Sequence, residues 1–406
     1  MVRLWIIADD YTGALDTGVK LAKRGIRTRV VNELPSVFPE DCEVLVWDTE
    51  TRHVKPDDAE EKIVDAVRRH REVPVIYKKT DSGLRGNIGA ELAALYAASG
   101  ENSLAFIPAY PEMNRITRGG IHYIDGVPVD ESSFGKDPFN PVQYSSVDVI
   151  VQEQTGHPVT LCTDGTKPLA KGINIFDCES REQMDALAEE LKAQGVRILA
   201  GCAGFGECLP AYLGFEESEP KMPEFKEPLL VICGSIHPVA KAQLACAEAA
   251  GVFRLTLAPE EVLAENFCET ERGREVLERI RRHLANGEPV MVDSIERVKG
   301  STNAAAERMG LEKNQIGRRA ARTHASISRA FYRDPACGTI FFIGGDTLQE
   351  CMWMLNVTEM EPVGEPEGGL VAAYVDPEGE RRAVLTKSGG FGTEDLLLRV
   401  LEHIRE

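Results

Sequence analysis

The stretch Leu4-Trp5-Ile6-Ile7-Ala8-Asp9-Asp10-Tyr11-Thr12-Gly13 carries the pattern on which the fold prediction rests. Its first five residues are apolar, which predicts a buried strand, and Thr12-Gly13 suits the start of a helix. In open α/β sheets, ligands bind beyond the carboxyl ends of the strands. A helix cap accounts for one of the two aspartates, but the pair Asp9 and Asp10 at one strand end favours a functional site.

The alternation of strand and helix continues through the first half of the chain. Strands separated by helices of this length form βαβ units and a mostly parallel sheet. The predicted strands span residues 4–8, 28–31, 44–47, 75–78, 104–108, 159–163, 173–177 and 198–203, and the predicted helices span residues 13–24, 57–71, 87–98 and 182–194.

A break in this rhythm predicts two domains. Residues 213–228 carry three prolines and five glutamates with little apolar periodicity, which is typical of a linker. We therefore predict domains at 1–212 and 229–406, and an α/β fold of two domains with mostly parallel sheets and an active-site cleft between them. In the second domain, strands are predicted at 229–233, 253–256, 290–292, 340–343, 370–374 and 383–386, and helices at 239–250, 271–285, 313–332 and 393–404.

Composition excludes several classes of partner. The 406 residues include 46 Lys and Arg against 65 Asp and Glu, a formal net charge of −19. Bulk nucleic-acid binding and docking on an anionic membrane both require the opposite charge. No apolar run approaches the roughly 20 residues of a membrane helix, and the start of the chain turns acidic too soon for a signal peptide. The ten cysteines show no metal-ligand spacing, so we expect reduced, buried thiols and a cytoplasmic protein.

A second polar cluster follows the predicted strand 75–78. The segment 78–87, KKTDSGLRGN, places Lys79, Asp81, Ser82 and Arg85 between a strand and a helix, where charge-assisted hydrogen bonds to a ligand can form. It matches neither a Walker A loop nor GxGxxG. Arg52 lies beyond another strand at the same expected edge. We expect Arg52, Lys79 and Arg85 to form a positive pocket suited to a carboxylate.

The region 108–140 is rich in Pro, Gly, polar and aromatic residues. Long loops of this kind inside a compact domain are usually functional or disordered, and the aromatic content argues against disorder. We expect a functional loop. An isolated histidine is more often structural, so His122 alone is no site.

Three strand ends in the second half carry glycines and precede helices. They are CGSIHP at 233–238, FIGGDT at 342–347 and KSGGFGTE at 387–394. Each can aim backbone N–H groups and a helix N-terminus at an anion. A tight turn explains any one of them, but three in one domain indicate a phosphate-bearing ligand. We expect a nucleotide site outside the Walker and Rossmann patterns.

Together these motifs resemble the four-carbon acid sugar kinase family over nearly the whole chain. The matching segments are IADDYTGALDTG at 7–18, TETRHV at 49–54, KKTDSGLRGNIGAEL at 78–92, PAYPEMNRITRGGIHYIDGVPVDES at 108–132, GSIHP at 234–238, GGDT at 344–347 and KSGGFG at 387–392. The resemblance implies an N-terminal sugar-acid-binding domain, a C-terminal nucleotide-binding domain and ATP as phosphoryl donor. It also implies phosphorylation of the terminal hydroxyl of threonate, erythronate or an oxo-tetronate.

The resemblance also assigns residues to the two ligands. For the substrate these are Asp10, Arg52, Lys79, Thr80, Asp81 and Ser82, and for ATP they are Ser235, Gly344, Gly345, Asp346, Thr347, Gly389 and Gly390. The polar clusters described above add Asp9 and Arg85 to the expected substrate-binding residues. Two positions depart from the family pattern. Ile236 and His237 stand where Ser or Cys is frequent, and Gly390 stands where many members have Asn, so a side-chain contact to the adenosine or the phosphates is altered there.

As a mechanism, we expect Arg52 and Lys79 to hold the sugar carboxylate while Asp10 or Asp81 orients the terminal hydroxyl and accepts its proton. Mg²⁺ would bridge the ATP phosphates, with ligands that the sequence does not assign. Two alternatives are an NAD-dependent sugar-acid dehydrogenase, against which the missing GxGxxG argues, and a non-catalytic sugar-acid sensor, which leaves the glycine turns without a role. The sequence does not decide which acid is used or whether the chain forms a homodimer.

Overall fold

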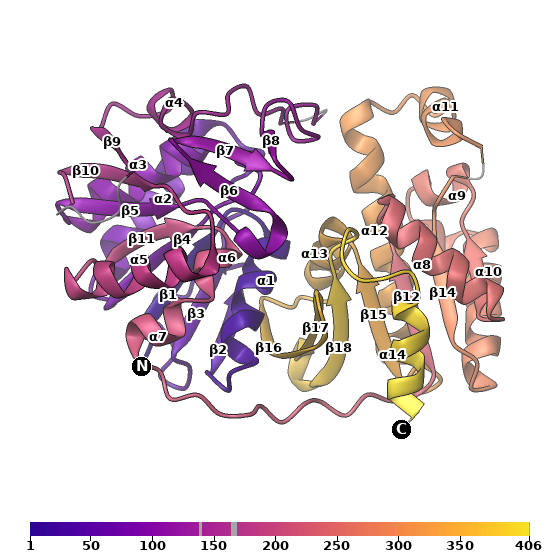
Figure 1. Cartoon of the computed structure of the whole chain (residues 1–406). Helices are drawn as coiled ribbons and strands as arrows, with labels where there is room; N and C mark the ends of the chain where they lie inside the picture. Colours follow the sequence, from indigo (N-terminus) through magenta and orange to yellow (C-terminus); the bar gives the residue numbers. More distant parts are fainter. Residues whose placement is uncertain (138–139, 164–168, 297, 406) are drawn as a thin grey trace. The chain divides into compact units, whose positions relative to one another are not determined.

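The computed structural model describes residues 1–137, 140–163, 169–296 and 298–405. The chain divides into two compact units, Met1–Pro220 and Lys221–Glu406. The division lies inside the segment 213–228. Figure 1 shows the two units in the colours of the sequence, and each is described by itself.

The first unit is built on a sheet of eight strands, all paired in parallel, in the order β2-β3-β1-β4-β11-β5-β10-β9. Its elements are β1 (Leu4–Ala8), α1 (Tyr11–Ala22), β2 (Thr28–Val31), β3 (Val44–Asp48), α2 (Pro56–His70), β4 (Val75–Lys79), α3 (Ile88–Ser99), β5 (Ser103–Ile107), α4 (Val147–Gln152), β9 (Val159–Cys162), β10 (Gly172–Phe176), α5 (Arg181–Ala193), β11 (Ile198–Gly201), α6 (Ala203–Gly206) and α7 (Leu209–Leu213).

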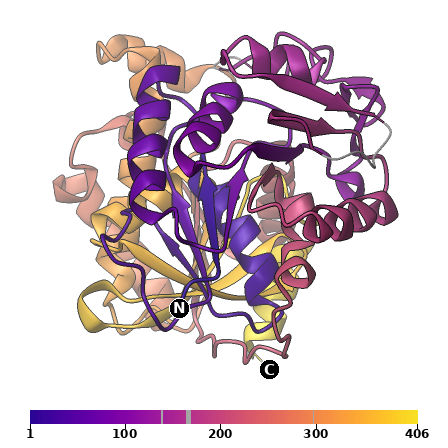
Figure 2. The ribbon, with the colours of Figure 1, turned by 90° about the vertical axis from the view of Figure 1, so that its left-hand side faces the viewer.

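Strand β1 has the residue pattern expected of a strand whose sheet is covered by helices on both faces. All five of its residues are buried, because a parallel strand covered on both sides needs apolar residues at every position. Trp5 and Ile7 point to one face and pack in a cluster with α2 and α3, while α1 and α5 cover the other face (Figure 2). The predicted strands and helices of this unit agree with the structure to within a few residues.

The region 108–140 is not one long loop, which corrects the sequence-based expectation. After the turn of 3₁₀ helix Pro111–Met113, it forms a small antiparallel sheet of β6 (Arg115–Arg118), β7 (Ile121–Ile124) and β8 (Val127–Pro128). The connections are the two-residue turns Gly119-Gly120 and Asp125-Gly126, all with positive φ. Gly-Gly and Asp-Gly between apolar residues are signals for tight hairpin turns, and the composition of the region masked them. Residues 138–139 lie outside the described residues.

The second unit holds seven strands in the order β13-β14-β12-β15-β18-β17-β16. Its elements are β12 (Leu229–Cys233), α8 (Pro238–Ala249), β13 (Phe253–Thr256), α9 (Pro259–Leu263), α10 (Glu271–Ala285), β14 (Val290–Asp293), α11 (Ser301–Arg308), α12 (Lys313–Tyr332), β15 (Thr339–Ile343), α13 (Gly345–Met354), β16 (Glu359–Glu367), β17 (Leu370–Val375), β18 (Arg382–Lys387) and α14 (Leu396–Arg405), with short 3₁₀ turns at Phe267–Glu269 and Pro377–Gly379.

The pairing in this unit is parallel from β13 to β18, and β17 pairs antiparallel with both β18 and β16. The prediction of two α/β domains with mostly parallel sheets is confirmed. Strand β16 was not predicted, because Pro362, Gly364 and Pro366 are typical of breaks in a strand. The register of β16 against β17 shifts at these residues, so the strand accommodates them with bulges.

Across the described residues, no helix is both long and apolar enough to cross a membrane. The ten cysteines are all free thiols, and seven of them are buried. In the same part of the chain, no three His, Cys, Asp or Glu side chains gather as a group that could hold a metal ion.

Candidate active site

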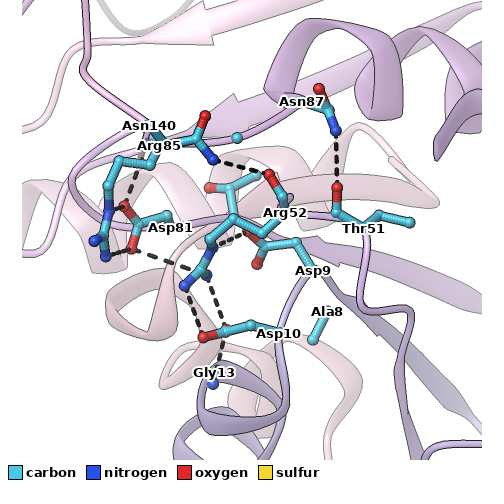
Figure 3. A network of polar contacts seen from close by, with 12 residues as sticks. Ala8, Asp9, Asp10, Gly13, Thr51, Arg52, Asp81, Arg85, Asn87 and Asn140 are labelled. Atoms are coloured by element: carbon cyan, nitrogen blue, oxygen red, sulfur yellow. Dashed lines mark hydrogen bonds and ion pairs between the residues drawn. The ribbon is translucent and has the colours of Figure 1, made fainter. Parts of the chain in front are cut away.

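The substrate residues predicted for the first unit converge at the carboxyl ends of three adjacent strands. Figure 3 shows five of them, Asp9, Asp10, Arg52, Asp81 and Arg85. Asp9 and Asp10 follow β1, Arg52 follows β3, and the segment from Thr80 to Arg85 follows β4. This convergence follows from the parallel order β3-β1-β4, which brings three strand ends to one edge.

Arg52 is the centre of the cluster. Its Nε donates to Asp9 Oδ2 at 2.7 Å, while Nη1 and Nη2 donate to the two carboxylate oxygens of Asp10 at 2.7 and 2.8 Å. Nη2 also lies 3.9 Å from Asp81 Oδ1. Burial opposes the charge of Arg52, but the carboxylates of Asp10, Asp9 and Asp81 raise its pKa well above the ordinary value. The guanidinium N–H groups of Arg52 are therefore occupied by the carboxylates of Asp9 and Asp10, and they hold these carboxylates in position.

The two aspartates that follow β1 differ in exposure. The side chain of Asp9 is 3% exposed and that of Asp10 is 29% exposed. Burial raises the pKa of Asp9, but Arg52, Lys78 and Lys79 outweigh it and leave the pKa below its usual value. Asp10 also caps α1, since its Oδ1 accepts the N–H of Gly13 at 3.0 Å. Asp10 therefore serves both as a helix cap and as the carboxylate that a ligand can reach.

Two consecutive lysines end β4, and they point to opposite faces of the sheet. Lys78 is fully buried, pairs with Glu91 of α3 at 2.9 Å and donates to the carbonyl oxygen of Ile7. Lys79 is 5% exposed, and its Nζ donates to the carbonyl oxygen of Thr80 at 2.9 Å. Among the described residues Lys79 has no carboxylate partner, so its ammonium retains donors for an anionic ligand.

Gly13 is required where these groups meet. A Cβ atom at Gly13 would lie 2.5 Å from Asp10 Oδ1 and 2.7 Å from Lys79 Nζ. The hydroxyl oxygen of Thr80 and Oδ1 of Asp9 are buried and lack a hydrogen-bond partner within the described part of the chain. Unpartnered buried polar atoms beside a carboxylate and an ammonium are typical of a site that a polar ligand completes.

Asp81 and Arg85 form the far side of the cluster. Arg85 Nε and Nη2 donate to the two oxygens of Asp81 at 2.8 and 3.2 Å, and Arg85 Nη1 donates to Asp137 at 3.0 Å. Burial raises the pKa of Asp81, but Arg52 and Arg85 outweigh it and hold that pKa far below its usual value. Asp81 is therefore a permanent anion and a weak proton acceptor.

Sequence reasoning missed the contribution of the small sheet. Arg115 of β6 donates through Nη1 to the hydroxyl of Ser82, and its guanidinium lies 5.3 Å from the ring centre of Phe134. His122 of β7 lies 3.0 Å from the carbonyl oxygen of Ser82 and 3.0 Å from Thr117 Oγ1. Burial lowers the pKa of His122 to about 4, so the ring is neutral and structural, as expected. Spacing in the sequence gave no signal for Arg115.

The ATP residues predicted for the second unit also converge, at the carboxyl ends of the adjacent strands β12, β15 and β18. A Cβ atom at Gly389 would overlap Ser235 Oγ, and one at Gly234 would overlap Thr347 Oγ1. Gly344 has a φ of +115° and faces the backbone nitrogen of Ser235.

The remaining predicted positions lie at the same edge. Gly345 and Asp346 open α13, and Gly390 lies against the ring of His237. Three glycine-bearing turns, with the hydroxyls of Ser235 and Thr347 packed against them and the N-termini of α8 and α13 beside them, make a cradle of N–H and O–H groups suited to phosphate. The structure brings all seven predicted positions together.

Comparison with known proteins places these two units in a class. A family model for a sugar-binding N-terminal domain matches residues 4–209, and one for a nucleotide-binding C-terminal domain matches residues 230–397. The class is thus a two-domain kinase with a sugar site in one domain and a nucleotide site in the other. More specifically, the chain belongs to the four-carbon acid sugar kinase family, as the motifs predicted.

Curated relatives of this family match along the whole chain. A D-threonate kinase of Salmonella typhimurium is 27% identical, covering 100% of this chain and 99% of its own. A D-erythronate kinase of Heliobacterium modesticaldum is 27% identical, covering 100% and 97%. A 3-oxo-tetronate kinase of Methylobacterium radiotolerans is 25% identical, covering 99% of each chain. These matches support neither the dehydrogenase nor the sensor alternative.

Two crystal structures share the fold. One, from Salmonella typhimurium, has a TM-score of 0.82 at 19% identity, covering 98% of this chain and 99% of its own. The other, from Haemophilus influenzae, has a TM-score of 0.75 at 19% identity, covering 99% of each. At this identity the likeness concerns the fold alone.

Proposed function

We propose that this protein transfers the γ-phosphoryl group of ATP to the terminal hydroxyl of a four-carbon sugar acid of the threonate, erythronate or oxo-tetronate class. In this reaction the hydroxyl oxygen forms a bond to the γ-phosphorus, the bond from that phosphorus to the β,γ-bridging oxygen breaks, and ADP leaves. The hydroxyl proton passes to a base on the protein. The full-length kinase relatives and the two residue clusters support this assignment.

The observation that carries the proposal is that the carboxylate of Asp10 and the ammonium of Lys79 both lie next to Gly13. Asp10 Oδ1 and Lys79 Nζ both lie within 2.7 Å of the place where a Cβ of Gly13 would stand. A short ligand with a carboxylate and hydroxyl groups can reach both groups from there. We assign Lys79 to the substrate carboxylate and Asp10 to the hydroxyl proton.

This assignment refines the roles expected for Arg52 and Asp81. Because the donors of Arg52 are engaged by Asp9 and Asp10, we propose that Arg52 positions Asp10 and does not grip the substrate carboxylate. Because Asp81 is held anionic by Arg85 and Arg52, we propose that it shapes the pocket and that Asp10 is the base.

ATP would bind in the second unit, on the turns around Ser235, Gly344 and Gly389. The described residues offer no cage of carboxylates or imidazoles for a metal, so Mg²⁺ would arrive on the ATP phosphates and keep part of its water shell. When bound, the metal neutralises charge on the phosphates. Sugar acid and ATP are thus the proposed small-molecule partners, and the cytoplasm is the proposed location.

The test is an ADP-release assay with Mg·ATP against both enantiomers of threonate and erythronate and against the oxo-tetronates. We expect release with at least one acid and none without Mg²⁺. Absence of release with every acid, from protein that binds ATP, would contradict the proposed substrate class.

A further inference from the structure

A buried lysine in the second unit lacks the partner that such a charge normally has. Lys387 is the last residue of β18 and is 3% exposed. Its Nζ donates to the carbonyl oxygen of Ser388 at 2.9 Å. Among the described residues, no carboxylate forms an ion pair with it. An ammonium taken out of water without an opposite charge is costly, so such a group is kept where something pairs with it.

The strand register places Lys387 beside the nucleotide cradle. Ile343 of β15 pairs with Cys233 of β12 on one side and with Lys387 on the other. Residues level with one another in parallel strands point to the same face of a sheet. Cys233 and Ile343 share a buried cluster with Ala240 in the first turn of α8. The ammonium of Lys387 therefore lies on the face covered by the N-terminal end of α8.

The electrostatics of this place call for an anion. The N-terminus of a helix carries partial positive charge, so a cation beneath it is repelled unless an anion lies between them. Helix α8 spans 12 residues, and the turn before it contains Ser235. The turn that follows Lys387 lies against Ser235, since a Cβ at Gly389 would overlap its hydroxyl. Helix, lysine and glycine turns thus converge on one position.

The first unit contains the same local arrangement. Lys79 is also the last residue of a strand, is also buried, and also donates at 2.9 Å to the carbonyl oxygen of the residue that follows it. It too lies at the start of a helix, where a Cβ of Gly13 would stand 2.7 Å from its Nζ. Each unit therefore presents one buried ammonium at a strand end beside a helix N-terminus.

We propose that Lys387 binds a phosphate oxygen of the nucleotide and is the cation that neutralises its di- or triphosphate within the second unit. This inference rests on the proposed function, because it takes ATP as the ligand. It adds a phosphate-binding side chain to a cradle otherwise made of backbone N–H groups and hydroxyls. Lys387 is a binding residue, and its role is distinct from that of Lys79 in the other unit.

Proton uptake provides a signature of this contact. Burial lowers the pKa of Lys387 to about 8, so part of the side chain is neutral at that pH in the free protein. A bound phosphate favours the charged form, and nucleotide binding should therefore take up a proton near pH 8. Phosphate itself is fully ionised there, because its second pKa is about 6.

The titratable groups near Lys387 and the cradle include Cys233, Asp293, His237 and Asp346. Burial raises the pKa of Cys233 to about 12, so its thiol stays neutral. Asp293 on β14 is already bonded to Arg254 and Thr256. At the cradle, His237 caps α8 through Nδ1, and Asp346 is exposed at the start of α13.

The experiment is calorimetry of the whole protein with ADP, tripolyphosphate and adenosine, in two buffers of different ionisation enthalpy. Wild type should take up about half a proton per ADP at pH 8. Lys387→Met should weaken ADP and tripolyphosphate binding by about tenfold or more, leave adenosine binding unchanged and abolish the uptake. Lys226→Met is the matched control, since Lys226 is exposed at the opposite end of the sheet, beside the start of β15, and should behave as wild type.

Three results would overturn the inference. They are wild-type ADP affinity in Lys387→Met, an equal loss of adenosine binding, and absence of proton uptake by wild type between pH 7.5 and 9. The last measurement needs no variant and stands even if Lys387→Met fails to fold. ADP release by wild type with a sugar acid, alongside any of these results, would refute the role of Lys387 and leave the kinase assignment intact. Failure of wild type to bind ADP or ATP would refute both.

Discussion

Replacing Gly13 by alanine tests the geometry of the sugar-acid site without removing any polar group. The new Cβ would lie 2.5 Å from Asp10 Oδ1 and 2.7 Å from Lys79 Nζ, whereas ordinary contacts begin at about 3.4 Å. The two groups must therefore move by about 0.9 and 0.7 Å. A misplacement of about 1 Å costs on the order of 100-fold in rate, so we expect kcat/KM to fall by about that factor. The backbone N–H of residue 13 is still present as the donor of the cap hydrogen bond, which lengthens as its acceptor Asp10 Oδ1 moves.

Stability should change much less than activity in this variant. Overpacking costs about 1–3 kcal/mol, and alanine in a helix recovers about 0.5–1 kcal/mol relative to glycine. We expect a net loss of about 0–2.5 kcal/mol in the free energy of unfolding, measured by urea titration. Gly317→Ala is the matched control, because a Cβ there meets no atom within 4 Å in helix α12. It should be slightly more stable and fully active. A Gly13→Ala protein with kcat/KM within threefold of wild type would refute the reasoning.

Further predictions concern the charged cluster. Asp10→Asn should lower kcat by at least about 100-fold, while Asp125→Asn in an exposed hairpin turn should have no effect; equal kcat values for the two variants would exclude Asp10 as the base. Arg52→Met leaves Asp9 buried without its partner and should lower the free energy of unfolding by about 3–5 kcal/mol in urea; a loss below 1 kcal/mol would contradict the pairing. The folded-state pKa of Asp81 lies below its ordinary value of 3.8, so its stabilising contribution is complete above about pH 5 and is lost progressively as the pH falls from 3.8 to the lower folded-state pKa. Asp81→Asn should therefore flatten the decline in stability below pH 5, and an unchanged decline would refute this.

Much of the first unit could be predicted from the sequence because its signals are local. Five apolar residues followed by two aspartates define a buried strand and a polar strand end without knowledge of any partner. Once the strands are parallel, Asp10, Arg52 and Asp81 must reach one edge, and the structure places them there.

Other features depend on contacts that a single segment does not contain. Arg115 lies 33 positions from Ser82, and only the tertiary structure brings the two together. Strand β16 exists because β17 pairs with it, despite its prolines. Lys387 looks like any lysine at a strand end until the structure shows that it is buried and that no carboxylate among the described residues pairs with it. The hydrogen bonds from Arg52 to Asp9 and Asp10 were not predicted either, because the positive charge of Arg52 alone suggested that it binds the substrate carboxylate.

The interior position of β1 in its sheet has a consequence for how the site works. All five residues of β1 are buried between β3 and β4, and Asp9 and Asp10 continue directly from this strand. These carboxylates are therefore anchored to a fully buried strand that is paired on both sides, and α1, which Asp10 caps, holds them from the other side. Their conformational freedom is already lost when the chain folds, so binding of a small, flexible acid has to order only the acid itself.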